Sequence, residues 1–205
     1  MCTRYYMEMS PLLRPYVEAA NRSPLNSMLS SKLNRSMITE GEVRPGDIAP
    51  VIATSRKGTM AAYPMSFGFS SPKGGLILNA RIETVSQKPM FSQAWARRRC
   101  IIPASGYFEW QHSAGNNGKK IIGDKYSFMA ADSKATWLCG LYRIDDGLPC
   151  FVIITKDASP GILSIHDRMP LIMPDNAVRR WIDPYADPEE LSKLAVNNLV
   201  YDKVN

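Results

Sequence analysis

The chain has 205 residues, of which 45% are hydrophobic and 21% are charged, proportions that are typical of a soluble globular protein. No apolar run approaches the roughly 18 residues of a membrane span, and no basic region followed by an apolar leader opens the chain, so we expect a cytoplasmic protein. The formal net charge of +6 favours a polyanionic partner, although solvated lysines and arginines alone would give the same balance.

The cysteines and histidines show no spacing that is typical of a metal site. Cys100, Cys139 and Cys150 stand in apolar runs, where buried and inert thiols are expected. No CxxC pair is present, and His112 and His166 are the two histidines of the sequence. The sequence therefore predicts no metal ion and no cofactor.

A helix is predicted near the start of the chain, followed by a series of strands. Residues 11–21 have a helical pattern with Ser10 as the predicted cap and prolines in the first turns. The stretch from Ser23 to Asn34 has no clear assignment. A turn at Pro45-Gly46 leads into the first strand, and Pro64 indicates an edge or a bulge. The strand-like segments are, in chain order, residues 47–53, 59–69, 76–85, 99–111, 126–131, 136–143 and 149–155.

Three further helices and a polar loop lie among and after these strands. Residues 89–99 begin with a proline in the first turn, and residues 175–183 and 187–195 form two short helices, the second capped by Asp187. The polar, glycine-rich stretch from His112 to Lys125 predicts an exposed hairpin or loop. The pattern favours an α+β fold in one domain, residues 1–205, with a mainly antiparallel, curved or barrel-like β-sheet and a few flanking short helices.

One strand-like segment, GYFEW, carries a carboxylate among aromatic residues. Strand alternation places Phe108 and Trp110 on one face, which we expect to be the core face. Glu109 then lies beside Tyr107 on the opposite face. A solvated surface carboxylate would fit the same pattern, so alternation leaves the role of Glu109 open.

Two other segments place polar residues next to apolar strands. In LILNARIET, Asn79 and Arg81 share a strand face, which can equally be an exposed surface. In SIHDRMPLIM, His166 and Arg168 precede a turn into an apolar strand. A lone histidine is more often structural than catalytic, and His112, at the mouth of the polar loop, is the more incidental of the two.

The opening MCTRYY places a cysteine directly behind the initiator methionine. If Met1 is removed, Cys2 carries both a free α-amine and a β-thiol. The ordinary pKa values of these groups, about 8 for the amine and about 8.5 for the thiol, allow both to reach reactive forms near neutral pH. Cys2 is therefore a candidate 1,2-aminothiol nucleophile.

These segments together resemble the SOS response-associated peptidase (SRAP) family of abasic site processing proteins. The resemblance is carried by MCTRYY, LILNARIETV, FSQAWARRRCIIPASGYFEW and IHDRMPLIM, which stand in the family's order and spacing along most of the chain. Two departures stand out. Thr3 follows the cysteine where the family usually has glycine, and Phe67-Gly68-Phe69 stands where many members have Trp-Gly-Leu.

The resemblance implies an enzyme of the DNA damage (SOS) response that senses abasic sites in single-stranded DNA. Cys2, freed by removal of Met1, would condense through its amine with the sugar aldehyde and close a thiazolidine ring through its thiol. The product would be a covalent protein–DNA linkage that protects the site. Weak lyase activity and autoproteolysis, as in a protease or hydrolase, are also implied. Because nothing in the sequence indicates an obligate partner surface, we expect a monomer.

The same resemblance implies the residues that act. Glu109 would shuttle protons at the amine, His166 would transfer a proton at the departing sugar oxygen, and Asn79 would hydrogen-bond the sugar beside Cys2. The residues expected to contact DNA are Arg4, Arg81 and Arg168 at phosphates and Phe67 against a base.

Two other hypotheses fit the sequence. In the first, Cys2 and His166 serve an N-terminal-nucleophile amidase or thiol peptidase, although no glycine-rich oxyanion segment stands out. In the second, the protein is a non-catalytic binder of single-stranded DNA in which Cys2 is incidental.

Overall fold

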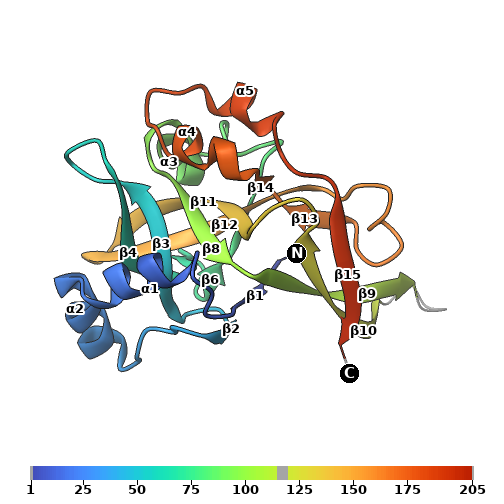
Figure 1. Ribbon diagram of the computed structural model, residues 1–205, viewed down its shortest axis with the longest axis horizontal. Coiled ribbons are helices and arrows are strands. Elements are labelled where there is room, and N and C mark those ends of the chain that lie inside the picture. The colour runs from blue at the N-terminus through green and yellow to red at the C-terminus, as the bar shows by residue number, and fades with distance from the viewer. Residues whose placement is uncertain (1, 115–119, 205) are drawn as a thin grey trace.

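Five strands close into a barrel at the centre of the molecule (Figure 1). The structure is a computed structural model that describes residues 2–114 and 120–204. Around the barrel each strand is hydrogen-bonded to the next in the order β3, β4, β12, β11 and β8, and β8 returns to β3. The β4–β12 pairing is parallel and the other four are antiparallel. The strands span Ile48–Thr54 (β3), Met60–Phe67 (β4), Leu148–Asp157 (β12), Thr136–Asp145 (β11) and Arg99–Ala104 (β8).

The barrel strands are buried on both faces, which is why they read as continuous apolar runs. Successive residues belong to two different buried clusters. Ile101 packs in the cluster that includes Trp95 and Trp181, whereas Ile102 packs in the cluster that includes Tyr107 and Cys2. The predicted mainly antiparallel, barrel-like sheet is confirmed.

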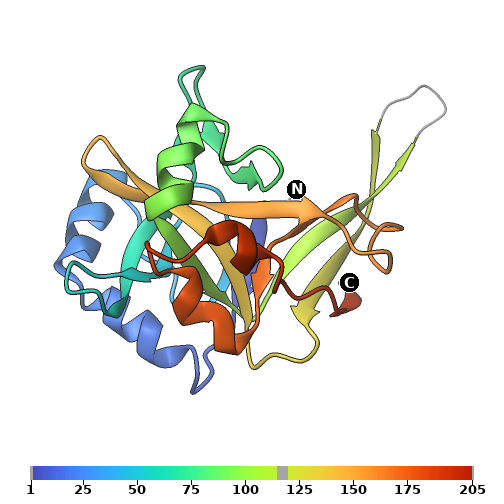
Figure 2. The same cartoon turned by 90° about the horizontal axis from the view of Figure 1, so that it is seen from above.

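A second sheet of five antiparallel strands leaves the barrel at Ser105. Its order is β15, β10, β9, β1 and β2, and the β9–β10 hairpin extends away from the barrel on the side opposite α1 and α2 (Figures 1 and 2). Gly106 begins β9 where a side chain would collide with the carbonyl oxygen of Phe128 on β10. The strands span Arg4–Met7 (β1), Gly41–Val43 (β2), Gly106–Ala114 (β9), Lys120–Ala130 (β10) and Leu199–Val204 (β15).

Short helices and strands complete the fold. The helices span Arg14–Asn21 (α1), Pro24–Leu33 (α2), Pro89–Arg97 (α3), Val178–Trp181 (α4) and Pro188–Ser192 (α5), with a 3₁₀ turn at Asp175–Ala177 (η1). The remaining strands span Phe69–Ser70 (β5), Leu76–Ile77 (β6), Asn79–Arg81 (β7), Arg168–Pro170 (β13) and Ile172–Met173 (β14). Among the described residues, no helix has the length and apolar character that crossing a membrane requires.

Several element boundaries differ from those predicted. Helix α1 begins at Arg14 rather than at residue 11, because the segment before it forms a turn in which Ser10 Oγ accepts a hydrogen bond from the Leu13 amide at 3.2 Å. The strand predicted over residues 76–85 ends at Arg81 and is followed by turns. The hairpin or loop predicted from 112 to 125 is formed as a hairpin by the paired ends of β9 and β10, and its tip, residues 115–119, lies outside the described residues.

Helix α2 fills the segment that had no assignment. Ser23 accepts a hydrogen bond from the Leu25 amide at 3.3 Å, Pro24 occupies the first turn, and Asn34 ends the helix with a left-handed φ of 49°. These are recognisable start and stop signals. Because Leu29 is the one fully buried residue of α2, the helix lacks the apolar stripe by which helices are usually identified.

Arg99, at the start of β8, ties the segment after α4 to the end of α3. Its side chain is almost fully buried and donates hydrogen bonds to five backbone carbonyl oxygens, those of Trp95, Ala96, Trp181, Asp183 and Ala186. A guanidinium has five N–H donors, so this arrangement uses its full capacity. The last three acceptors fix the course of residues 181–186 against the barrel.

We expect Arg99→Met to lower the free energy of unfolding by about 3–5 kcal/mol, because the buried carbonyl groups lose their donors. Urea denaturation monitored by circular dichroism measures the change. Arg97→Met is the matched control, since exposed Arg97 makes one hydrogen bond, to the Pro184 carbonyl at 3.0 Å, and its loss should cost less than about 1 kcal/mol. Equal denaturation midpoints for the two variants would contradict the structural role of Arg99.

Candidate active site

Cys2 lies two residues before the start of β1 and is completely buried. Its Sγ lies 3.8 Å from the Arg4 carbonyl oxygen, to which the thiol donates. Burial raises the pKa of the Cys2 thiol well above its ordinary value, and the nearby Glu109 carboxylate raises it further. The thiol is therefore held in its neutral form. Met1, whose removal the sequence hypothesis requires, lies outside the described residues.

Asn79 contacts Cys2 directly. Strand β7 is held by parallel pairing with Ile153–Thr155 of β12, which places the Asn79 amide at the start of the chain. Its Nδ2 donates a hydrogen bond to the Cys2 carbonyl oxygen at 2.8 Å. Its Oδ1 is buried and has no hydrogen-bond partner within the part of the chain that the structure describes. Asn79 thus fixes the Cys2 backbone and keeps an acceptor oxygen available.

Glu109 is buried, so the prediction that it lies opposite the core face of β9 was wrong. The register Tyr5↔Tyr107 turns Tyr107 and Glu109 inward, where they are 0% and 3% exposed, and turns Phe108 and Trp110 outward, where both are half-buried. Hydrophobicity alone misassigned the faces, because the two outer aromatic rings are covered by cationic side chains. Lys125 Nζ lies 3.7 Å from the Phe108 ring centre, and the Arg4 guanidinium lies 5.2 Å from the Trp110 ring.

His166 lies beside Glu109. Its Nε2 is 3.7 Å from Glu109 Oε2, and both side chains are almost fully buried. The Arg168 amide donates to His166 Nδ1 at 2.9 Å, and two acceptors, the Arg168 carbonyl oxygen and Asp167 Oδ1, lie 3.1 Å from the same nitrogen. An imidazole placed between a donor, these acceptors and a carboxylate can gain or lose a proton at either ring nitrogen.

A pocket of about 410 Å³ opens over this group. Its lining residues are Thr3, Arg4, Glu109, Trp110, His112 and Ile122. The His112 ring lies 4.5 Å from the His166 ring, and the His112 amide donates to the Ile165 carbonyl at 3.0 Å, which ties the loop that carries His166 to β9. From the sequence, Trp110 was expected in the core and His112 was expected to be incidental. Their position in the pocket could have been inferred from their closeness in sequence to Glu109.

The residues expected to contact DNA fall into three environments. Arg4 lines the pocket and pairs with Glu42 at 2.9 Å. Arg81 is exposed, and its side chain has no hydrogen bond or ion pair with any other described residue. Phe67 is completely buried and stacked on Phe151 at 5.0 Å, so its ring offers no face to a base and the expected stacking role is not supported.

Arg168 is also not placed as expected, because its guanidinium is buried in an internal network. It makes two hydrogen bonds of 2.9 Å to the Glu83 carboxylate, pairs with Asp157, and donates to the Thr155 carbonyl oxygen at 2.9 Å. This fork–fork geometry is typical of a structural ion pair. In this arrangement the Arg168 side chain positions β13, which follows His166, rather than presenting a free charge to a phosphate.

The assembled groups are the Cys2 thiol, the Asn79 amide, the His166 imidazole and the Glu109 carboxylate, and Glu109 is the member of the group that lines the pocket. This set can provide a nucleophile, transfer protons and hydrogen-bond a polar substrate. Within residues 2–114 and 120–204 the structure contains no cluster of three or more His, Cys, Asp or Glu side chains that could hold a metal ion.

Comparisons with known proteins identify relatives along most of the chain. The family model described as SOS response associated peptidase (SRAP) matches residues 1–204. The abasic site processing protein YedK of Escherichia coli is 30% identical over 131 residues, which cover 60% of this chain and 55% of that protein. YoqW of Bacillus subtilis, of the same description, is 34% identical over 127 residues, with 59% and 54% covered. HMCES of Pongo abelii, also so described, is 31% identical over 203 residues, with 82% and 54% covered.

The chain spans about half the length of these curated relatives. Solved structures share its fold. A crystal structure of a Bacteroides thetaiotaomicron protein superposes with a TM-score of 0.73 at 21% identity and covers 100% of this chain and 92% of that one. A Bordetella bronchiseptica protein superposes with a TM-score of 0.69 at 22% identity over the full length of both chains.

We expect Glu109→Gln to lower the pKa of the Cys2 thiol, because the substitution removes a negative charge that opposes thiolate formation and keeps the shape of the side chain. A pH titration of the ¹³Cβ chemical shifts of labelled cysteine measures this pKa. Cys139, whose pKa is raised chiefly by burial, is the control within the same molecule and should not change. A Cys2 pKa that stays the same or rises in the variant would contradict the electrostatic coupling.

Proposed function

The chain belongs to the SOS response associated peptidase (SRAP) family, and on that premise we propose that it processes abasic sites in single-stranded DNA by covalent linkage through Cys2. The relatives' description as abasic site processing proteins supports the substrate. The observation that carries the proposal is a chain of neighbours from four separate parts of the sequence. Asn79 hydrogen-bonds the Cys2 carbonyl, the Glu109 carboxylate raises the pKa of the Cys2 thiol, and His166 lies 3.7 Å from Glu109.

The proposed reaction begins when removal of Met1 converts the Cys2 nitrogen from an amide into an amine. The amine adds to the C1′ aldehyde of the opened abasic sugar, and loss of water gives an imine. The Cys2 sulfur then bonds to the imine carbon, and its proton passes to the nitrogen, which closes a thiazolidine. Because amine and thiol belong to one residue, ring closure is intramolecular and strongly favoured by proximity.

The neighbouring side chains supply the proton transfers. Glu109 is adjacent to Cys2 and 3.7 Å from His166, so the pair can remove a proton from the attacking amine and deliver one to the departing water. Asn79 holds the Cys2 carbonyl at 2.8 Å and so fixes the backbone of the nucleophile. In this proposal Glu109 and His166 are catalytic residues and Asn79 is a positioning residue.

The raised pKa of the Cys2 thiol weighs against the thiol peptidase alternative. A peptidase of that kind needs a thiolate nucleophile with a lowered pKa, whereas burial and Glu109 favour the neutral thiol here. Thiazolidine formation begins with the amine instead, and the thiol is needed only after the imine has formed. The site therefore suits the crosslinking reaction better than amide hydrolysis.

We expect Cys2→Ala to lose the stable crosslink to single-stranded DNA with one abasic site, by at least about 100-fold, because the variant keeps an amine but cannot close the ring. A denaturing gel measures the crosslink, and borohydride should still trap the open imine of the variant. Cys150→Ser is the matched control, because Cys150 is a buried cysteine and a hydroxyl can replace the hydrogen bond that its thiol donates to the Arg143 carbonyl. A stable Cys2→Ala adduct would refute the ring-closure step.

We expect a single extra residue before Cys2 to abolish crosslinking, because an amide nitrogen cannot condense with the aldehyde. A cleavable tag that leaves Cys2 first after proteolysis allows the same preparation to be compared before and after cleavage. The gel should show no adduct before cleavage and full adduct after it, with mass spectrometry confirming each N-terminus. Equal adduct in both samples would show that another residue is the nucleophile.

A further inference from the structure

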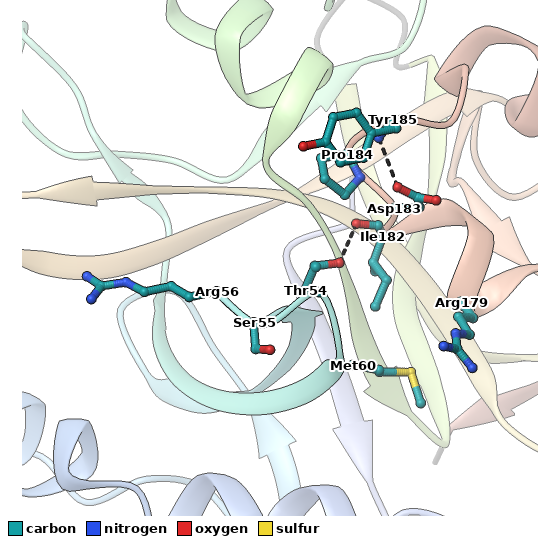
Figure 3. A pocket seen from close by; sticks show the side chains of 10 residues that line it. Thr54, Ser55, Arg56, Met60, Arg179, Ile182, Asp183, Pro184 and Tyr185 are labelled. Atoms are coloured by element: carbon teal, nitrogen blue, oxygen red, sulfur yellow. Dashed lines mark hydrogen bonds between the residues drawn. The ribbon is translucent and has the colours of Figure 1, made fainter.

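A second pocket lies away from the candidate active site, between the β3–β4 turn and the segment that follows α4 (Figure 3). In Figures 1 and 2 the β3–β4 turn and the chain's N-terminus are clearly separated along the long horizontal axis. The pocket has a volume of about 350 Å³ and is lined by Thr54, Ser55, Arg56, Gly58, Met60, Arg179, Ile182, Asp183, Pro184 and Tyr185.

The wall of this pocket is held by hydrogen bonds. Thr54 Oγ1 donates to the Ile182 carbonyl at 2.7 Å, which joins the end of β3 to the end of α4. Arg99 donates from beneath to the carbonyl oxygens of Asp183 and Ala186 on either side of Tyr185. Asp183 Oδ1 accepts from the Tyr185 amide at 2.9 Å. The backbone that carries Tyr185 is therefore fixed.

Tyr185 is 88% exposed on this fixed backbone. The Arg97 guanidinium lies 5.5 Å from its ring centre and contacts the ring from one side. A large aromatic side chain that a rigid loop presents to solvent leaves a flat surface on which another ring can stack. A nucleobase is the ring for which such stacking is largely independent of sequence.

Two arginines flank the pocket. Arg56 and Arg179 are both exposed, and neither side chain has a hydrogen bond or ion pair with another residue in the described ranges. Figure 3 shows them on opposite sides of Thr54 and Ser55, so they do not converge on one point. Separated guanidinium groups suit successive phosphates along an extended strand better than a single compact anion. Asp183, the carboxylate of the pocket, already accepts from the Tyr185 amide.

We propose that this pocket is a second binding site for single-stranded DNA, in which a base stacks on Tyr185 and the flanking phosphates contact Arg56 and Arg179. The identity of the strand rests on the proposed function. The site makes no contact with Cys2 and takes no part in the covalent step. It would hold DNA at a distance from the abasic sugar and so favour longer strands over short ones.

The test measures non-covalent binding of an intact single strand of about 30 nucleotides, which is long enough to exceed one binding site, by fluorescence anisotropy. Tyr185→Ala should weaken binding roughly tenfold, and Tyr185→Phe should bind as the wild type does, because it keeps the ring. Arg179→Ala should also weaken binding and should lower the slope of log affinity against log salt concentration by about 0.7, the contribution of one phosphate contact.

Arg22→Ala is the matched control, because Arg22 is exposed at the C-terminal cap of α1, does not line the pocket, and its loss changes the net charge equally. Crosslinking of an abasic strand of about 8 nucleotides should be the same in all variants. One outcome would overturn the second site alone. In it, crosslinking is normal, and Tyr185→Ala and Arg179→Ala bind the intact strand as tightly as Arg22→Ala does. Tyr185-dependent binding without crosslinking in the wild type would support the second site and refute the proposed reaction.

Discussion

The candidate active site depends on the position of β1 in the interior of a sheet. Tyr5 pairs with Tyr107 on β9 and with Val43 on β2, so the first strand has hydrogen-bonded neighbours on both sides. The start of a chain is ordinarily among its most mobile parts. Here the sheet holds β1, and Cys2, two residues before it, is buried where the Glu109 carboxylate affects its thiol. The entropy of placing Cys2, the proposed nucleophile, is thus lost on folding rather than on binding substrate.

Burial of this group of side chains keeps the Cys2 thiol in its neutral form. Glu109 and His166 are both nearly inaccessible to solvent, and a buried carboxylate is tolerated where a partner offsets the cost of losing water. The same burial raises the pKa of the Cys2 thiol, with Glu109 adding to the effect. The carboxylate and the neutral thiol are therefore linked, since negative charge on one disfavours negative charge on the other.

The net charge of +6 does not describe how the arginines are used. Arg99 and Arg168 are buried and hydrogen-bonded within the fold, where each positions a segment beside a pocket. Arg81, Arg56 and Arg179 are exposed and have no ion-pair partner in the described part of the chain. Part of the positive charge is therefore used within the fold, and composition alone cannot distinguish the exposed arginines from the structural ones.

The sequence by itself determined the barrel strands, which are long apolar runs, and the last helix, whose Asp187 cap accepts from the Glu189 amide at 2.9 Å. It also supplied Cys2 and Glu109 as candidate residues through their family motifs. It did not predict β1, which is short, or β15, which is largely exposed. Only the tertiary structure decided which face of β9 points inward and which side chains meet. Alternation separates two faces of a strand, but the pairing of distant strands selects the buried one.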